Sequence, residues 1–260
     1  MKLANRIWTI AYPVLMYYVA ISLGIYIAQM IFGADTEHYM LCKIIGSLVA
    51  IPVVFADYKQ NLIMTGRYKV KNPVANNEII LLIMILSCTV FLSLGLNNII
   101  SMSPLVTMSA EYQNANASFY GGAFLIEFIS AALITPFLEE LLHRGVVYGR
   151  LRAMMGIWPS VIVSALIFAG LHFNIVQFVY AFLLGMVFAI FVEKTGKLYP
   201  VVIAHMVANG LAVIRTETGF LQSTVDGSAS AWFISIGFGL IGIGILIMII
   251  GIQKKEETNE

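Results

Sequence analysis

The sequence predicts an all-α, polytopic membrane bundle of about eight transmembrane helices with both termini in the cytoplasm. Of its 260 residues, 60% are hydrophobic and 11% are charged, whereas a soluble domain carries about 25% charged residues. The hydrophobic residues form runs that approach the roughly 20 residues that a helix needs to cross a bilayer. Lysine and arginine gather on one side of these runs. Together these observations predict a single transmembrane domain over residues 1–260.

Eight apolar runs follow one another along the chain. The first follows Lys2 and Arg6 and exceeds the apolar region of a signal peptide, about 7–15 residues, so it is expected to stay as a membrane helix. The second and fifth runs are short. The predicted spans are residues 7–32, 40–56, 78–100, 119–142, 157–174, 176–193, 198–214 and 231–252.

The basic residues indicate an orientation. With the N-terminus in the cytoplasm, only Lys43 and Arg215 fall on the outer face, and all other basic residues fall on the inner face. Cytoplasmic loops carry such an excess, and the pattern supports an even number of spans. The inner residues are Lys2, Arg6, Lys59, Arg67, Lys69, Lys71, Arg144, Arg150, Arg152, Lys194, Lys197, Lys254 and Lys255.

Two classes of site are disfavoured. The net charge of +1 gives no electrostatic basis for binding nucleic acid. The two cysteines, Cys42 and Cys88, lie in separate apolar runs and support neither a disulfide framework nor a zinc motif. We expect both to be small packing residues.

Polar residues inside the apolar runs are the candidate functional residues, because charge within a bilayer is costly unless it is paired or hydrated. Glu139 and Glu140 lie in the inner half of the fourth run. Glu140 and Arg144 are four residues apart, so they share a helix face and can form an ion pair, while Glu139 points about 100° away. Pro136 lacks a backbone donor and is expected to kink the helix and free a carbonyl.

Two histidines and an asparagine follow on later helices. His172 ends the fifth run, and Asn174 belongs to the turn before the sixth. His205 and Asn209 are four apart in the seventh run and share a face; hydrogen bonding between helices is the structural alternative for this pair. Counted along straight helices, His172 lies about 22 Å and His205 about 12 Å from the inner boundary. They can meet only if the fifth and sixth helices are short, tilted or sunk in a cavity.

The other two histidines have simpler explanations. His38 is expected in the first outer loop, and His143 at the inner boundary beside Arg144. Neither is predicted to take part in the site.

The three polar segments, in this order, resemble the motifs of the CPBP family. That family contains CAAX-type prenyl endopeptidases and bacterial bacteriocin-processing and self-immunity proteins, also called Abi. The resemblance covers about residues 119–215. Each motif alone is a weak signal, but the three in this order are specific for the family. The motifs are Glu139-Glu140-x-x-x-Arg144, Phe168-x-x-x-His172 and His205-x-x-x-Asn209.

The resemblance implies an eight-helix bundle, with its catalytic core at residues 119–215, a cavity open to the cytoplasm and endopeptidase activity in the membrane plane. It implies that Glu139 is the catalytic glutamate and that His172 helps to hold the water molecule. His205 and Asn209 are implied as the remaining catalytic residues. The supporting residues are Glu140, Arg144 and Phe168.

Peptide hydrolysis needs an activated water, a stabilised oxyanion and a proton for the leaving amine. Glu139 is the natural general base, and Asn209 and His205 can donate to the oxyanion, at about 3 kcal/mol for one good donor. This mechanism needs no cofactor. The alternative is a zinc ion held by His172, His205 and Glu139 with an open water position. The resemblance favours the metal-free mechanism, and the sequence has no His-Glu-x-x-His motif.

Two other functions stay open. A non-catalytic immunity or scaffold protein of the same family would bind a peptide without cutting it. A proton-coupled transporter predicts an internal repeat or interrupted helices in both halves, which the sequence does not show. The expected partners are a peptide or membrane-protein substrate and the lipid bilayer. The small size favours a bacterial protein of the cell membrane; the sequence identifies neither substrate nor oligomeric state.

Overall fold

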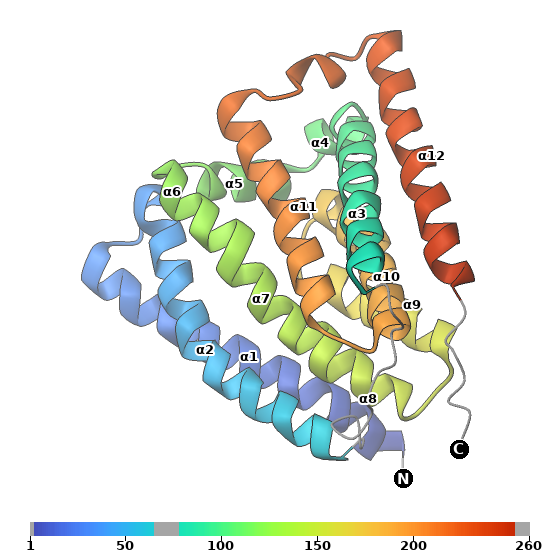
Figure 1. Ribbon diagram of the computed structural model, residues 1–260. Coiled ribbons are helices and arrows are strands. Elements are labelled where there is room, and N and C mark those ends of the chain that lie inside the picture. The colour runs from blue at the N-terminus through green and yellow to red at the C-terminus, as the bar shows by residue number, and fades with distance from the viewer. Residues whose placement is uncertain (1–2, 65–77, 253–260) are drawn as a thin grey trace.

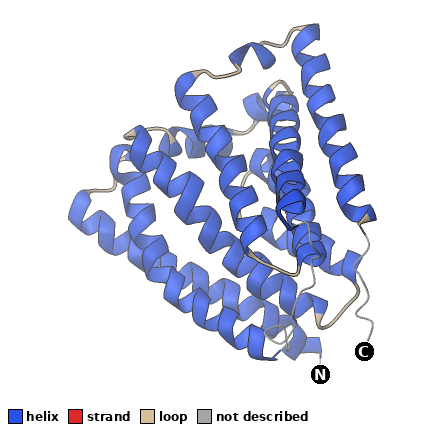
Figure 2. Cartoon of the chain, in the orientation of Figure 1, coloured by secondary structure: helices blue, strands red, loops and turns tan. Residues whose placement is uncertain are grey.

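The computed structural model describes residues 3–64 and 78–252, and every regular element in these ranges is a helix (Figure 2). Six of the described helices are long and apolar enough to cross a membrane. The predicted all-α polytopic bundle is therefore confirmed. The six helices are α1 (Leu3–Phe32), α2 (Thr36–Met64), α3 (Glu78–Ser101), α10 (Ile175–Thr195), α11 (Tyr199–Thr218) and α12 (Ala229–Gly251).

A further long helix runs from Phe124 to Arg152, after a bend of 114° that separates it from α5 (Ala110–Phe119). The apolar helix α9 (Ile157–Gly170) has only 14 residues. Each of the eight predicted runs overlaps a helix, while the number of crossings and the side of the termini stay predictions. The long helix comprises α6 (Phe124–Glu127), η2 (Phe128–Ile134), α7 (Thr135–Glu140), η3 (Leu141–Tyr148) and α8 (Gly149–Arg152); α4 (Pro104–Met108) and η4 (Gln222–Thr224) are short turns of helix.

The helices pack in pairs around a central layer. α1 packs along α2 on one side of the bundle and α3 packs along α12 on the other (Figure 1). The long helix and α11 lie between these pairs, and α9 packs on α10. The segments that carry the three motifs, α7 with η3, α9 and α11, thus occupy the middle of the bundle.

Glycines bring the helices of the outer pairs close together. A Cβ atom on Gly24 of α1 would lie 2.7 Å from the Cα atom of Gly46 on α2. A Cβ atom on Gly95 of α3 would lie 2.7 Å from the backbone nitrogen of Gly239 on α12. Small residues at such crossings are typical of helices that associate in lipid, where dispersion contacts replace the hydrophobic effect.

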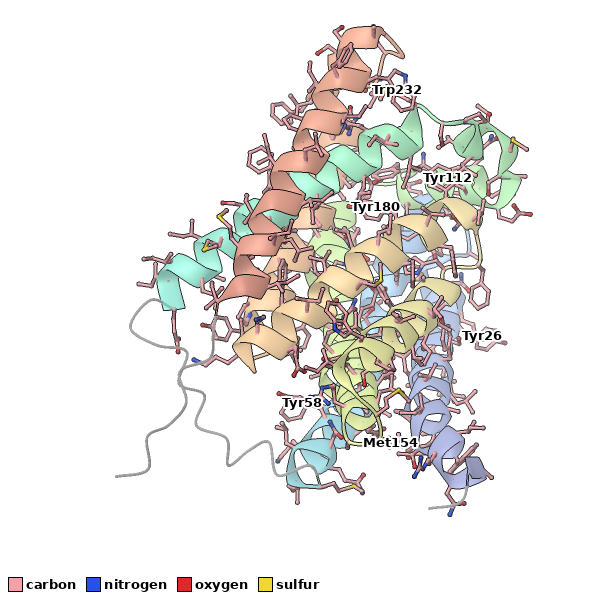
Figure 3. All side chains as sticks on the ribbon, turned by 90° about the vertical axis from the view of Figure 1, so that its right-hand side faces the viewer. Tyr26, Tyr58, Tyr112, Met154, Tyr180 and Trp232 are labelled. Carbon is pink, nitrogen blue, oxygen red and sulfur yellow. The ribbon has the colours of Figure 1, made fainter. Side chains whose placement is uncertain are left out.

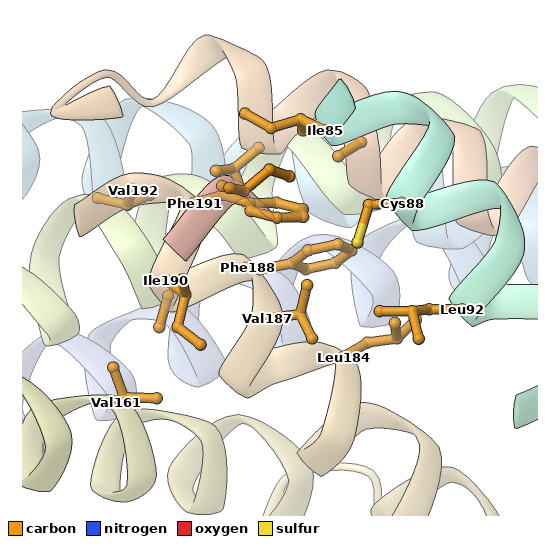
Figure 4. Packing of buried hydrophobic residues seen from close by; sticks show 14 of the residues in the cluster. Ile85, Cys88, Leu92, Val161, Leu184, Val187, Phe188, Ile190, Phe191 and Val192 are labelled. Carbon is orange, nitrogen blue, oxygen red and sulfur yellow. The ribbon is translucent and has the colours of Figure 1, made fainter. Parts of the chain in front are cut away.

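A hydrophobic cluster joins α3, α10 and α11, and Phe188 and Phe191 are buried at its centre (Figure 4). Cys88 belongs to this cluster, and both Cys42 and Cys88 are buried and free. The prediction that the cysteines are packing residues is confirmed. Large apolar side chains also cover the outside of the bundle, among them Tyr26 on α1 (Figure 3), as expected for a protein whose solvent is lipid.

The fourth predicted span differs most from the structure. It was expected to end at residue 142, but the helix continues to Arg152. The helix continues because its arginines are paired inside the protein: Arg150 contacts Asp57 at 3.0 Å, and Arg152 contacts Glu193 at 3.0 Å. The glutamate pair therefore lies in the middle of a long helix rather than near one end of it.

Several charged or titratable residues that the sequence placed at the outer face lie within helices. Lys43 lies inside α2 and Arg215 inside α11, where Arg215 is buried and bonds Asn98 of α3. His38 lies in the first turn of α2, and its backbone N–H donates to Asp35 at 2.9 Å. This hydrogen bond and a second from the His38 ring hold the pKa of the Asp35 carboxyl below its usual range. Some inner basic residues lie outside the described ranges: Lys2, Arg67, Lys69, Lys71, Lys254 and Lys255.

Candidate active site

The long helix widens on both sides of the glutamate pair. η2 and η3 are π-helical, and α7 between them begins at Thr135 with Pro136 in its first turn. The N–H of Thr135 donates to the carbonyl of Ser130, five residues back. With the same spacing of five residues, the carbonyl of Ala131 would accept a hydrogen bond from the backbone nitrogen of residue 136. This residue is Pro136, which has no N–H. The predicted disturbance at Pro136 thus takes the form of a π-helical segment, a feature frequent at functional sites.

Asn209 satisfies the carbonyl that Pro136 leaves free. Its Nδ2 donates to the Ala131 oxygen at 3.0 Å, from α11 to η2. This is the hydrogen bond between helices that the sequence left open as the structural alternative for Asn209. An amide nitrogen carries two hydrogens, so one remains for another acceptor.

Glu140 forms the buried centre of a polar network. Its Oε1 accepts from Arg144 Nη1 at 2.9 Å and lies 2.7 Å from Nδ1 of His205. Glu140 is 0% and Arg144 1% exposed. The ion pair predicted from their spacing is present, but Glu140 also binds the histidine of the third motif. Because an ionised carboxylate only accepts hydrogen bonds, Nδ1 of His205 carries a proton.

Glu139 lies on the other side of the same histidine. Its Oε2 is 3.8 Å from Nε2 of His205, and its side chain is 17% exposed while that of Glu140 is fully buried. The separation of 3.8 Å is too long for a direct hydrogen bond, and a water molecule about 2.8 Å from each atom would bridge it. The two adjacent glutamates therefore differ as their helical positions predict: one is held in a network and the other faces outward from it.

The ring of Phe168 holds the polar side chains together. The imidazoles of His143, His172 and His205 lie 4.9, 5.1 and 5.9 Å from it, centroid to centroid, and all three are edge-on. The Arg144 guanidinium lies 4.5 Å from the ring centroid, within cation–π range. Phe168 comes from α9, so the second motif reaches the other two through one aromatic side chain.

His172 and His205 contact the same Phe168 ring because α9 is short. The helix ends at Gly170, and His172 follows in the turn before α10. Its Nδ1 lies 3.1 Å from the carbonyl of Phe168, which can only accept, so Nε2 of the neutral ring is left as an acceptor. Asn174 closes the turn, and its side chain accepts from the N–H of Gln177. This confirms that Asn174 belongs to the turn.

Two contributions to the site, from His143 and Tyr17, and one buried carboxylate outside it, Glu127, were not expected from the sequence. His143, assigned to a boundary, is 2% exposed and packs on Phe168. Glu127 is 1% exposed, and its Oε1 accepts from the Gly122 N–H at 2.8 Å, closing the bend after α5. Tyr17 of α1 lies within electrostatic range of Glu139. The sequence could have indicated Glu127, because it is a carboxylate within the predicted span 119–142. Nothing in the sequence indicated Tyr17.

The zinc alternative can be compared with this geometry. Among the residues that the structure describes, no three histidine, cysteine, aspartate or glutamate side chains converge on a point that a metal ion could occupy. Nδ1 of His205 is engaged by Glu140 and Nδ1 of His172 by a carbonyl, which leaves Nε2 of each ring, as in many zinc sites. The disagreement with zinc lies in the spacing: His172, His205 and Glu139 do not converge on one metal position in this arrangement, so no step below is derived through a metal.

The fold and the cluster define a class: a multi-pass membrane protein with a buried glutamate–histidine network between its central helices. Residues 121–211 match the family model for the type II CAAX prenyl endopeptidases, Rce1-like. All three motifs lie in the matched segment, which confirms the resemblance to this family. The family that this segment matches is one of membrane endopeptidases. No curated protein sequence and no solved structure matched the chain.

Proposed function

We propose that the protein is an intramembrane endopeptidase that cleaves peptide or membrane-protein substrates with a water molecule activated by Glu139. The observation that carries this proposal is the pair of facing atoms Glu139 Oε2 and His205 Nε2, 3.8 Å apart. One water between them would contact a base and a histidine at once. The proposal rests also on the family of the matched segment.

Glu139 is the general base in this mechanism. It removes a proton from the water as the oxygen attacks the carbonyl carbon of the scissile bond. The same carboxylic acid then delivers the proton to the leaving amine. His172 suits the task of orienting the water, because its Nε2 is left as an acceptor when Nδ1 bonds the Phe168 carbonyl.

The oxyanion requires donors. Asn209 can offer its second amide hydrogen, since the first bonds Ala131. His205 can donate from Nε2 only when both ring nitrogens are protonated, because Nδ1 already donates to Glu140. Glu139 beside Nε2 and Glu140 beside Nδ1 would balance the positive charge of this doubly protonated ring. Removal of one oxyanion donor typically costs about 10²–10³-fold in turnover.

Glu140, Arg144 and Phe168 are supporting residues in this proposal. Arg144 neutralises Glu140 and donates from Nη2 to the carbonyl of Gly185 on α10 at 3.2 Å. Glu140 then fixes the ring of His205, much as a carboxylate orients a metal-bound or catalytic histidine elsewhere. The cytoplasmic opening of the site, the absence of a cofactor and the bacterial cell membrane as location remain part of the proposal.

The decisive test compares Glu139→Gln with the wild-type protein in nanodiscs. We expect cleavage of a peptide library to fall by about 10²–10⁴-fold, with an unchanged thermal unfolding midpoint because Glu139 makes no direct hydrogen bond with a described residue. Glu78→Gln, on the partly exposed Glu78–Lys197 pair, is the matched control and should keep full activity. Full activity of Glu139→Gln would refute the mechanism. A cellular phenotype that survives the loss of cleavage would favour the non-catalytic immunity or scaffold function.

A further inference from the structure

The turn between α9 and α10 has a strained backbone. Phe173, the residue after His172, has a φ angle of 55° and so lies in the left-handed region. A residue with a Cβ atom is disfavoured there, and a bulky residue most of all. The Phe173 ring is 75% exposed, so packing of the ring does not offset this cost. The conformation is therefore held by the groups around it, and residues held in this way cluster at functional sites.

Local hydrogen bonds hold both sides of Phe173. Before it, the N–H of His172 donates to the carbonyl of Ala169 at 3.1 Å. After it, Nδ2 of Asn174 donates to the carbonyl of His172 at 3.0 Å. These contacts join residues that are close in the sequence, and they leave the carbonyl of Leu171 for a donor from another part of the chain.

Tyr18 of α1 supplies this donor. Its hydroxyl donates to the carbonyl of Leu171 at 3.2 Å. Within the described ranges, no other hydrogen bond reaches residues 171–174 from outside the segment 168–178. Tyr18 is half-buried, and Tyr17 packs edge-on against its ring at 5.1 Å. The turn is thus held to α1 by one hydrogen bond from a side chain that is itself packed in place.

The same part of α1 contacts the helix of the first motif. Tyr17 belongs to a buried cluster that includes Leu138, the residue before Glu139, and Tyr18 packs against this cluster. α1 carries no motif of its own. It connects the helix of Glu139 to the turn of His172 through two neighbouring tyrosines.

We propose that Tyr18 is a positioning residue of the peptidase site: its hydrogen bond to Leu171 holds the turn in the left-handed form and keeps the His172 ring in place. The inference rests on the proposed endopeptidase function. Without the hydroxyl, the Leu171 carbonyl loses its donor, and Phe173 can leave the left-handed region. The peptide bonds on either side of His172 would then rotate. Its ring, which stands at 90° to the Phe168 ring with the centroids 5.1 Å apart, would move away from the site.

The first experiment removes the hydroxyl from the full-length protein in nanodiscs, with a fluorogenic peptide that the wild-type protein cleaves. We expect Tyr18→Phe to lower kcat by about 10–100-fold, because a displacement of about 1 Å at a catalytic group has an effect of this size. KM should change little, because Tyr18 acts on His172 and not on the substrate. Tyr26→Phe removes an exposed hydroxyl from the same helix (Figure 3) and is the matched control, which should behave as wild type. An unchanged kcat, or a rise of KM alone, would overturn the inference.

The second experiment tests whether Tyr18 acts through the strained turn. Phe173→Gly accepts the left-handed conformation without a steric cost, whereas Phe173→Ala removes the ring and keeps a Cβ atom that disfavours it. The fall in kcat caused by Tyr18→Phe should therefore shrink to about 3-fold or less in the Phe173→Gly background, and should stay large in the Phe173→Ala background. Equal falls in all three backgrounds would show that the hydroxyl does not act through the turn and would overturn the inference.

A measurement that needs no cleavage separates this inference from the proposed function. In the Glu139→Gln variant with ¹⁵N-labelled histidine, Tyr18→Phe should shift the NMR signals of the His172 ring, which a His172→Gln variant identifies. The signals of His38, in the first turn of α2, should stay unchanged. Unshifted His172 signals would overturn the positioning role of Tyr18. Unimpaired cleavage by Glu139→Gln would refute the proposed mechanism, and the NMR comparison would still decide whether Tyr18 positions His172.

Discussion

Nδ1 of His205 lies 2.7 Å from Oε1 of Glu140, and this contact joins α11 to α7 inside the bundle. It gives Glu140 a second function besides neutralising Arg144. The spacing of Glu140 and Arg144 suggested a purely structural pair, whereas the geometry makes their pair the support of a proposed catalytic histidine.

Glu140→Gln should destabilise the protein strongly. Glutamine keeps an oxygen that can accept from His205, but it removes the charge that balances Arg144, which is 1% exposed. Breaking a buried ion pair by removing one partner costs about 3–5 kcal/mol, because the remaining charge stays buried. Thermal unfolding in nanodiscs measures the effect.

The matched control for Glu140 is Glu78→Gln. The pair of Glu78 with Lys197 is 42% and 30% exposed, so its loss should cost about 0–1 kcal/mol. Similar unfolding midpoints for the two variants would show that the Glu140–Arg144 pair does not stabilise the bundle.

Phe168→Leu should impair catalysis more than stability. Leucine fills much of the same volume, so we expect a loss of about 1 kcal/mol. The flat ring that contacts His172 and His205 would be gone, and a displacement of about 1 Å of catalytic groups can lower turnover by about 10²-fold. The measurement is kcat and KM beside the unfolding midpoint, and kcat should change most.

Phe91→Leu is the control for this comparison. Phe91 pairs with Phe238 at 5.9 Å between α3 and α12, where neither ring contacts the histidines. It should lower stability by a similar amount and leave kcat unchanged. An equal fall of kcat in both variants would indicate a general loss of packing rather than a positioning role for Phe168.

Much of the fold could be predicted because lipid imposes simple rules. Apolar runs located the helices, and the spacing of Glu140 and Arg144 predicted their ion pair. The end of the fourth span was wrong because the rules treat arginine as a boundary residue. Arg150 and Arg152 find buried or half-buried carboxylates on α2 and α10, and such partners depend on how distant helices pack.

The candidate site could be predicted in its motif residues and not in its surroundings. The motifs gave Glu139, His172 and His205 as candidate residues, whereas the approach of His205 Nε2 to Glu139 depends on the rotation of α11 against α7. The position of Lys43 over an aromatic ring could not be foreseen either, because a lysine near a predicted helix end is typical of a membrane boundary. Only the packing of α2 against α5 brings its Nζ over the ring of Phe119.

Removal of metal ions should leave cleavage intact. The proposed mechanism uses Glu139 and a water molecule without a metal. Activity after treatment with a zinc chelator, followed by buffer exchange, is the measurement. Loss of activity that returns on addition of zinc, but not magnesium, would require His172, His205 and Glu139 to rearrange into a ligand set.

Asn209 and Pro136 should be coupled in stability. Asn209→Ala leaves the Ala131 carbonyl without the donor that reaches it at 3.0 Å, and a buried unsatisfied carbonyl costs about 1–3 kcal/mol. Pro136→Ala restores a backbone N–H at residue 136. This N–H can donate to the Ala131 carbonyl, five residues earlier, just as the N–H of Thr135 donates to the Ser130 carbonyl. Asn209→Ala should therefore destabilise the protein much less in the Pro136→Ala background, and a double-mutant cycle of unfolding free energies measures the difference. If Asn209 also donates to the oxyanion, the double variant recovers stability but not turnover. Recovery of both would make Asn209 a structural residue alone, and additive losses of stability would show that Pro136 is not the reason that Ala131 needs Asn209.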